Sequence, residues 1–219
     1  LLIPLSVFFA TSNEQDTHPT HEQHDKLVQW AWKVFFSRRY SKRLEQLNTD
    51  ITLIKALRNG TSLQLGAFNV EINESFFTEN TFNLNAVNTK TFILLLANEV
   101  PLNFISGSPI QLEPVLRECN RKEFHHVYPR AFLAQLGISN NSVNSLANFT
   151  ILSRADNNKL GGNPPSVYRS RMTQNEEAVR LIMKKALCPE DIFHDDFTRF
   201  TQERVALLLT KAKQLMGIE

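Results

Sequence analysis

The chain is poor in cysteine, and this scarcity limits what can hold it together. Only Cys119 and Cys188 occur among its 219 residues, and no C-x-x-C pair is present. The sequence therefore argues against a disulfide scaffold and against structural zinc held by cysteines. Simple packing of both thiols in a reducing cytoplasm is the expectation that follows.

Long apolar runs are lacking as well. The first segment, "LLIPLSVFFATSN", is apolar but too short to span a bilayer. It has no positive n-region, no small-residue cleavage site and no initiator Met, which argues against a signal peptide. We interpret this segment as the cut end of a longer protein, so that the chain is a C-terminal piece, and we expect no membrane association.

Charge of either sign is not in large excess. Lys and Arg number 24 against 22 Asp and Glu, which gives a net charge of +2, and 42% of the residues are hydrophobic. This composition is that of an ordinary soluble globular protein. Because the molecule is not a polycation, any contact with nucleic acid must come from a local basic surface.

Helical periodicity dominates the first hundred residues. Apolar residues recur at helical spacing from about residue 22 to residue 47, and "RRYSKRLEQL" either continues that helix or opens the next. "DITLIKALRNG" predicts a further helix, with Asp50 as its N-cap and Gly60 beyond its end. "NTKTFILLLANEV" predicts a buried helix. We therefore expect residues 1–100 to form a helical scaffold.

The texture changes after Pro101. "NFISGSPIQLEPVL" predicts loops and short strands, because one Gly and two Pro interrupt it. "EFHHVYP" and "ANFTILS" predict two strands, "RAFLAQLGI" a short helix between them, and "RADNNKLGG" a short helix stopped by glycines. Two longer helices follow. The prediction is a mainly α-helical protein with a strand–insertion–strand–helix unit in residues 101–170 and a C-terminal helical region in 171–219.

Five polar residues in this central unit are candidates for chemistry. His125 and His126 are adjacent, Asn148 follows, and Asn157 and Lys159 lie close to one another further on. Phosphodiester hydrolysis needs a base for water, a cation to absorb charge and a held leaving group. A neutral imidazole with a pKa near 6.5 is a suitable base at cellular pH.

The pattern resembles the His-Asn-His superfamily of nucleases, whose site is a ββα-metal unit. "HHVYP" matches the first strand, "NFTIL" the second and "RADNNKL" the helix, with Asn157 in place of the usual third histidine. A closer resemblance is to the C-terminal nuclease domain of GmrSD-like type IV restriction enzymes and of SspE-like phage-defence proteins, and it is strongest over residues 117–168. "EFHHVYPRAFL", "NSLANFTILSRADNNKLGGNPPSVY" and "DDFTRFTQERVALLL" follow the order of that family.

The resemblance implies a role for each of the five residues. His126 would be the base, His125 would be a ligand of one divalent metal ion, and the side-chain oxygen of Asn157 would be another. Asn148 would tie the loop so that His126 points at its water. Lys159 would neutralise phosphate or support the start of the helix.

The metal and the geometry raise separate expectations. Two protein ligands leave room for several waters, which suits Mg²⁺ best and Mn²⁺ next, although a nitrogen ligand also tolerates nickel or zinc. Asn158 is an alternative to Asn157, but the spacing from Asn148 favours Asn157. Successive side chains on a strand point to opposite faces, so His125 and His126 share a site only if the strand bends or ends there.

Basic residues outnumber acidic ones around these motifs, which favours DNA as the partner. Such residues would contact the phosphate backbone, giving salt-sensitive and largely sequence-independent binding. The candidates for DNA binding are Arg121, Lys122, Arg130, Arg154 and Arg169.

Together these features predict a metal-dependent DNA endonuclease that nicks or cuts DNA in the bacterial cytoplasm, as the effector of an anti-phage restriction system. Relatives in the resembled family carry an N-terminal nucleotide-hydrolysing (NTPase) domain with a D-G-Q-Q-R-type motif. The motif is absent here, so that domain is the expected missing partner. The alternatives are a catalytically silent DNA-binding module and a helical regulatory or oligomerisation piece for the missing domain.

A second histidine cluster offers a rival metal site. "HPTHEQH" places His18, His21 and His24 three residues apart, and residues at this spacing are neighbours on a helix. Pro19 interrupts the start of such a helix, and neither cysteine nor a supporting carboxylate pattern accompanies the histidines. A polar helix entry is therefore favoured over zinc binding.

Overall fold

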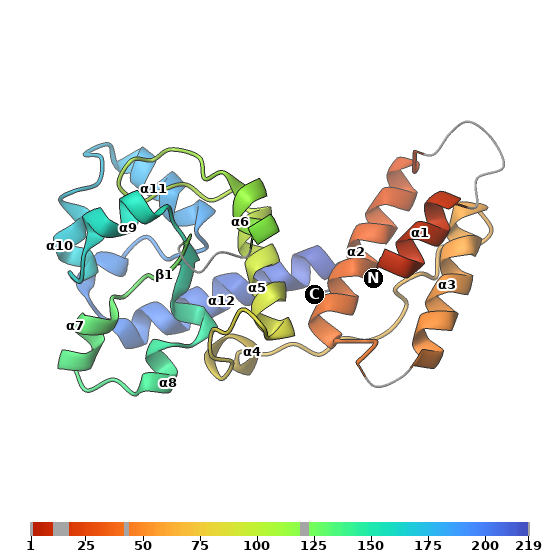
Figure 1. Cartoon of the computed structure of the whole chain (residues 1–219), viewed down its shortest axis with the longest axis horizontal. Helices are drawn as coiled ribbons and strands as arrows, with labels where there is room; N and C mark the ends of the chain where they lie inside the picture. The colour runs from red at the N-terminus through yellow and green to blue at the C-terminus, as the bar shows by residue number, and fades with distance from the viewer. Residues whose placement is uncertain (1, 11–17, 42–43, 119–122, 219) are drawn as a thin grey trace. The chain divides into compact units, whose positions relative to one another are not determined.

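The computed structural model describes residues 2–10, 18–41, 44–118 and 123–218, and the fold is mainly α-helical, as predicted (Figure 1). The described residues form two compact units, residues 1–72 with 212–219 and residues 73–211. These units do not coincide with the three predicted segments 1–100, 101–170 and 171–219. Segment 1–100 contributes residues to both units, segment 101–170 lies within the second unit, and segment 171–219 passes from the second unit to the first at residue 212.

The first unit is built from the helices α1 (Leu2–Ala10), α2 (His21–Ser37) and α3 (Leu44–Arg58). Thr20 and Gln23 form a capping box that starts α2, with the Gln23 amide donating to Thr20 Oγ1 and the Thr20 amide to Gln23 Oε1. Arg38, in the left-handed region with φ of 50°, ends the helix. The stretch "RRYSKRLEQL" therefore follows the end of α2, and its last four residues open the next helix, α3. The core of this unit is apolar: Phe8, Leu27, Trp30, Val34, Ile54, Leu57 and Leu65.

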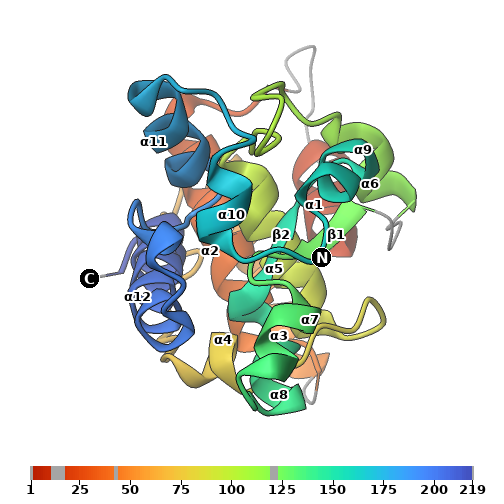
Figure 2. The ribbon, with the colours of Figure 1, turned by 90° about the vertical axis from the view of Figure 1, so that its left-hand side faces the viewer.

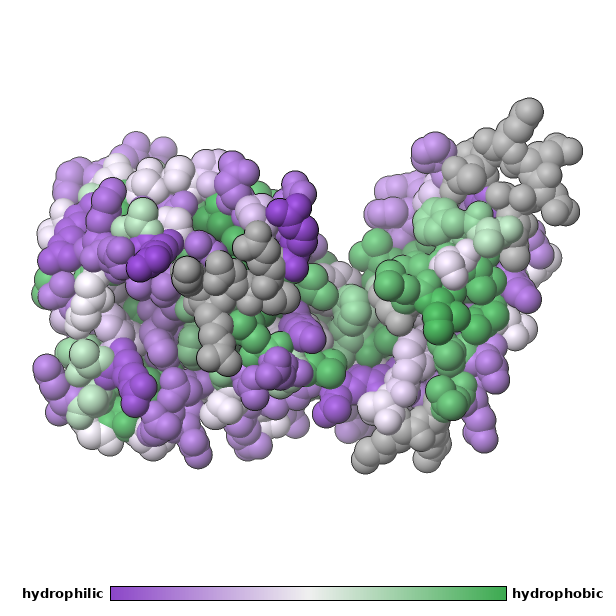
Figure 3. All heavy atoms as spheres, in the orientation of Figure 1, coloured by the Kyte–Doolittle hydropathy of each residue, from purple (hydrophilic) through white to green (hydrophobic). Residues whose placement is uncertain are grey.

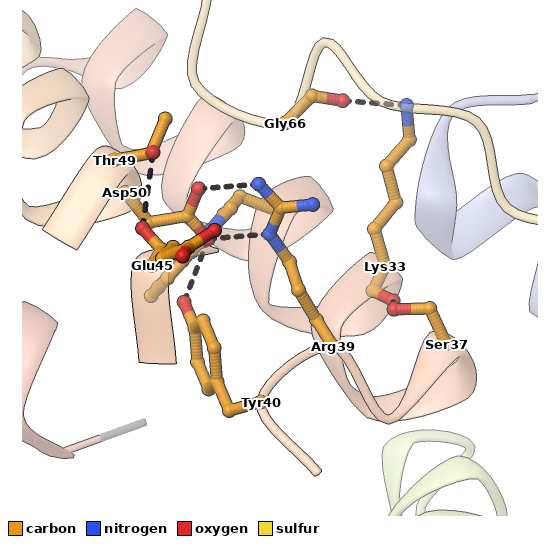
Figure 4. A network of polar contacts seen from close by, with 9 residues as sticks. Lys33, Ser37, Arg39, Tyr40, Glu45, Thr49, Asp50 and Gly66 are labelled. Carbon is orange, nitrogen blue, oxygen red and sulfur yellow. Dashed lines mark hydrogen bonds and ion pairs between the residues drawn. The ribbon is translucent and has the colours of Figure 1, made fainter. Parts of the chain in front are cut away.

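The prediction that Asp50 caps a helix is wrong, because α3 begins earlier and contains it. The Asp50 carboxylate is fully buried and accepts a hydrogen bond from Trp30 Nε1 at 3.0 Å. It also accepts from Tyr40 Oη and from Nε and Nη2 of Arg39, at 2.7 to 2.9 Å (Figure 4). The Arg39 guanidinium also lies 3.8 Å from the ring centre of Phe68. This paired charge joins α2, the residues after it and α3.

Hydrophobic side chains are unevenly distributed over the surface. In the first unit they gather over α1, where Leu2, Ile3 and Phe9 are exposed (Figure 3). No helix among the described residues has both the length and the apolar character that a bilayer-spanning helix needs.

The second unit surrounds one short antiparallel sheet with helices (Figure 2). Strand β1 (Phe124–His126) pairs with β2 (Phe149–Ile151) so that Phe124 lies opposite Ile151, His125 opposite Thr150 and His126 opposite Phe149. The described helices and 3₁₀ turns of this unit are α4 (Ser75–Thr78), α5 (Val87–Asn98), α6 (Leu112–Glu118), α7 (Arg130–Gln135), α8 (Asn140–Val143), η2 (Leu146–Asn148), α9 (Arg154–Leu160), α10 (Pro165–Arg169), α11 (Glu176–Lys185), η3 (Ile192–His194) and most of α12 (Phe197–Met216), whose residues from Ala212 on belong to the first unit.

The predicted helices in 87–98, 130–135, 154–160 and 176–185 and the two predicted strands are all confirmed. The prediction of loops and short strands after Pro101 is wrong in part, because α6 occupies Leu112–Glu118. Pro114 is tolerated there, since the first turn of a helix leaves its N–H groups without intrahelical partners.

An apolar cluster packs Val127 and Tyr128, which follow β1, against side chains from α7, α9, α10, α11 and α12. Tyr128 and Tyr168 are fully buried in this core, and the Tyr128 hydroxyl donates to the carbonyl of Ile192 at 2.8 Å. Burial raises the pKa of both phenols, so they are neutral packing groups. The core therefore fixes the loop that follows β1, which carries Tyr128.

Candidate active site

The candidate site is formed by β1, β2 and α9, in that order along the chain. The residues between the strands form α7, α8 and η2, so the predicted order of strand, insertion, strand and helix is present. A pocket that encloses about 270 Å³ opens beside these elements. It is lined by Phe124, His125, His126, Pro129, Arg130, Ala131, Phe149, Asn157, Leu160, Gly161 and Gly162.

The structure thus brings three of the five predicted residues, His125, His126 and Asn157, to one pocket. Both adjacent histidines line it because β1 ends at His126. Beyond that point the Val127 amide donates to the carbonyl of Asn148 at 2.8 Å, and the chain turns toward Pro129. The strand therefore ends at the histidine pair, which is the condition under which two adjacent side chains can share one site.

His126 is enclosed on two sides. Its ring centre lies 4.2 Å from that of Phe149, and its Nε2 lies 3.2 Å from Oδ1 of Asn144. Burial lowers the pKa of His126, the hydrogen bond with Asn144 opposes this shift, and the positive charge of Arg130 adds to it. The imidazole is therefore neutral near pH 7, the form that can accept a proton.

Asn148 does not line the pocket but holds its frame. It is fully buried; its Oδ1 accepts from the Tyr128 amide at 2.9 Å, and its Nδ2 donates to the carbonyls of Tyr128 and Val143 at 3.1 and 3.0 Å. One side chain thus connects the start of β2 with the chain beyond β1 and with the insertion. Asn148 therefore holds the main chain beside the site and does not itself face the pocket.

The start of α9 is anchored to the preceding loop. Ser153 caps the helix by accepting from the amide of Asp156, and its own amide donates to Oδ1 of Asn103 at 2.8 Å. The buried carboxylate of Asp156 accepts from the amides of Ile105 and Ser106 at 2.7 and 3.0 Å. These contacts fix the helix that carries the next residue, Asn157.

Lys159 lies in the last turn of α9, is exposed, and is not among the residues that line the pocket. Its main-chain carbonyl accepts a hydrogen bond from the Arg171 guanidinium, which fastens the end of the helix. The side chain of Lys159 therefore faces solvent near the site and does not lie in the pocket.

The candidates for DNA binding fall into three groups. Arg130 lines the pocket and, like Arg154 in the first turn of α9, is exposed. Arg169 is instead held by Glu176, at 2.5 Å, and by the carbonyl of Thr173, with 18% of its side chain exposed. Two candidates, Arg121 and Lys122, lie outside the described residues, as does Cys119.

Two site-forming residues were missed from the sequence, Arg204 and Asn144. Arg204 on α12 is fully buried and donates to the carbonyls of Ala147, Phe149 and Ala186 at 2.8, 2.8 and 3.2 Å. Two of these carbonyls flank Asn148. The available signal was that Arg204 lies four residues from both Phe200 and Leu208, on the apolar face of a helix.

Among the described residues, no group of three or more His, Cys, Asp or Glu side chains could hold a metal ion. This covers the rival cluster at residues 18–24, where His21 and His24 lie within 3.5 Å of Asp25 instead. The imidazoles of His125 and His126 and the carboxamide of Asn157 line the pocket, and those of His125 and Asn157 are the predicted metal donors.

Comparisons with known proteins add one relative. The chain is 25% identical over 228 aligned residues to an uncharacterized protein of Methanocaldococcus jannaschii, and the match covers 88% of this chain. The chain spans 37% of the length of that relative. No family model matches the sequence, and no solved structure matches it.

Proposed function

We propose that the chain is a metal-dependent DNA endonuclease whose site is a ββα-metal unit formed by β1, β2 and α9. One observation carries this proposal. His125, His126 and Asn157, which are distant from one another in sequence except for the histidine pair, line one pocket beside two strands and a helix. The sequence resemblance to restriction nucleases assigns these residue types to phosphodiester hydrolysis.

The donor set of the pocket fits a single, loosely held divalent ion. His125 would supply a nitrogen and Asn157 an oxygen, which leaves most coordination positions for water and phosphate. Mg²⁺ suits this arrangement best, and Mn²⁺ is also compatible. When bound, such an ion supplies positive charge that stabilises the phosphate in the transition state.

The residues of the chain account for the proton transfer. Neutral His126 accepts a proton from a water molecule, and the oxygen of that water attacks phosphorus as the P–O bond to the leaving sugar oxygen breaks. The leaving oxygen then takes a proton from solvent. Arg130, which lines the same pocket, would bind the phosphate through charge-assisted hydrogen bonds.

The surroundings of the pocket would bind the rest of the DNA. Arg154 and Lys159 lie at opposite ends of α9 and are exposed, so each is free to contact backbone phosphates on either side of the site. This contact type predicts affinity that falls steeply with salt. Arg169 is expected to contribute less, because Glu176 already holds its guanidinium.

The biological role that we propose rests on the resemblance. In it, the chain is the effector part of a cytoplasmic anti-phage restriction system and acts with an NTPase domain. A direct test is incubation of the chain with supercoiled plasmid in Mg²⁺, in Mn²⁺ and in EDTA. Relaxed or linear DNA in the two metals but not in EDTA supports the proposal. Salt-sensitive binding with no cleavage in either metal would replace it with the silent DNA-binding module.

A further inference from the structure

Asn144 makes a hydrogen bond to His126 whose direction the surrounding contacts determine. The Nδ2 of Asn144 donates to both the main-chain carbonyl and Oδ1 of Asn140, each at 2.8 Å. The opposite end of the same amide, Oδ1, lies 3.2 Å from Nε2 of His126. Asn144 therefore presents an acceptor to the imidazole.

The reverse orientation of the amide is disfavoured by the same contacts. If the amide of Asn144 were turned over, its oxygen would face the Asn140 carbonyl, which has no hydrogen to donate. The main chain of Asn144 is also fixed, since its carbonyl accepts from the Phe82 amide at 2.8 Å and its amide donates to the Asn140 carbonyl at 3.1 Å. The acceptor is thus held in place before any substrate binds.

An acceptor facing Nε2 decides which nitrogen of His126 carries the hydrogen. A neutral imidazole has one N–H, and the other nitrogen is bare. Because Oδ1 of Asn144 can only accept, Nε2 must be the protonated nitrogen in this contact. Nδ1 is then the nitrogen with a free lone pair.

We propose that Asn144 is a positioning residue that holds His126 as the Nε2–H tautomer and so makes Nδ1 the atom that accepts the proton from water. Phe149, packed against the imidazole, restricts rotation of the ring in the same orientation. The assignment of the tautomer stands on the geometry, whereas the use of Nδ1 as the base rests on the proposed function.

The tautomer can be measured without any activity. Long-range ¹H–¹⁵N correlation spectra of ¹⁵N-histidine-labelled, metal-free chain distinguish the two tautomers of a neutral imidazole by the shifts of both nitrogens. Wild type is expected to show the Nε2–H form for His126. Asn144→Ala, which removes the acceptor, should shift the signals toward a mixture of the two tautomers. Asn140→Ala is the matched control, because the main-chain carbonyl of Asn140 remains to hold Asn144.

Cleavage assays then test whether Nδ1 of His126 acts as the base. Asn144→Ala should lower kcat by about 10- to 100-fold with little change in KM, as is typical for a residue that orients another. If wild type cuts no DNA, the proposed function fails while the spectra still decide the tautomer. An Nδ1–H form in wild type, or spectra and kcat unchanged by Asn144→Ala, would overturn the inference.

Discussion

The side-chain amide of Asn148 binds the main chain of Tyr128 at both ends. Its Oδ1 accepts from the Tyr128 amide at 2.9 Å and its Nδ2 donates to the Tyr128 carbonyl at 3.1 Å. Since Tyr128 follows the histidine pair by two residues and Asn148 precedes β2, this contact sets the end of β1 against the start of β2. The contact lies directly beyond the pair of His126 and Phe149, the last pair of the sheet on this side.

Replacement of Asn148 should destabilise the second unit. Asn148→Ala leaves the buried amide and carbonyl of Tyr128 and the carbonyl of Val143 without these partners. We expect the free energy of unfolding to fall by roughly 2–4 kcal/mol, measured by urea denaturation followed by circular dichroism. Asn158→Ala is the control, because Asn158 is exposed. Equal denaturation midpoints for the two variants would contradict the positioning role.

Asn157 and Asn158 should differ in metal-dependent cleavage. The spacing in the sequence favours Asn157, and in the structure Asn157 lines the pocket with the histidines whereas Asn158 is exposed. Asn157→Ala should reduce the rate at limiting Mg²⁺ by at least about 10-fold, with partial recovery at high Mg²⁺, because one ligand oxygen is lost. Asn158→Ala should cleave like wild type. A titration of the cleavage rate against Mg²⁺ distinguishes the two variants. A larger loss of rate in Asn158→Ala than in Asn157→Ala would make Asn158 the metal ligand instead.

Arg204 should matter more than any exposed arginine on the same helix. In Arg204→Met the carbonyls of Ala147, Phe149 and Ala186 lose their donor inside the core, which should lower the free energy of unfolding by about 2–4 kcal/mol. Arg199→Met is the matched control, since Arg199 pairs with acidic groups at the surface of α12. Thermal unfolding of both variants tests this, and a larger loss for Arg199→Met would be inconsistent with the contacts described.

The order of elements in the site could be predicted from the sequence, because aromatic and β-branched stretches, helix caps and glycine stops are local signals. The partners of Asp50, Arg204 and Asn144 could not be predicted in this way, since Trp30, Ala147 and His126 lie far from them in the chain. Asp50 illustrates the difference: its sequence context fits a helix cap, but a buried position opposite Arg39 determines its role. Local sequence patterns therefore predict the order of the helices and strands, whereas the roles of the buried charged and amide side chains follow only from tertiary contacts.

Acidification should destabilise the metal-free chain through His126. Burial lowers the pKa of His126 in the folded state, so the unfolded chain binds the proton more readily. The resulting stability is fully present above the ordinary value of 6.5 and is lost as the pH falls below it. Unfolding midpoints between pH 8 and pH 5 should therefore drop more for wild type than for His126→Gln. His24→Gln should show the same pH dependence as wild type. The same drop in unfolding midpoint for wild type and His126→Gln would contradict a contribution of His126 to the pH dependence of stability.

The most direct test of the central claim is single-turnover cleavage of supercoiled plasmid in Mg²⁺ by wild type, His126→Ala and His24→Ala. His24 is an exposed histidine of the other unit and serves as the matched control. If His126 is the base, His126→Ala should cleave about 10²- to 10⁴-fold more slowly than wild type, and His24→Ala should equal wild type. Equal cleavage by wild type and His126→Ala would contradict the account.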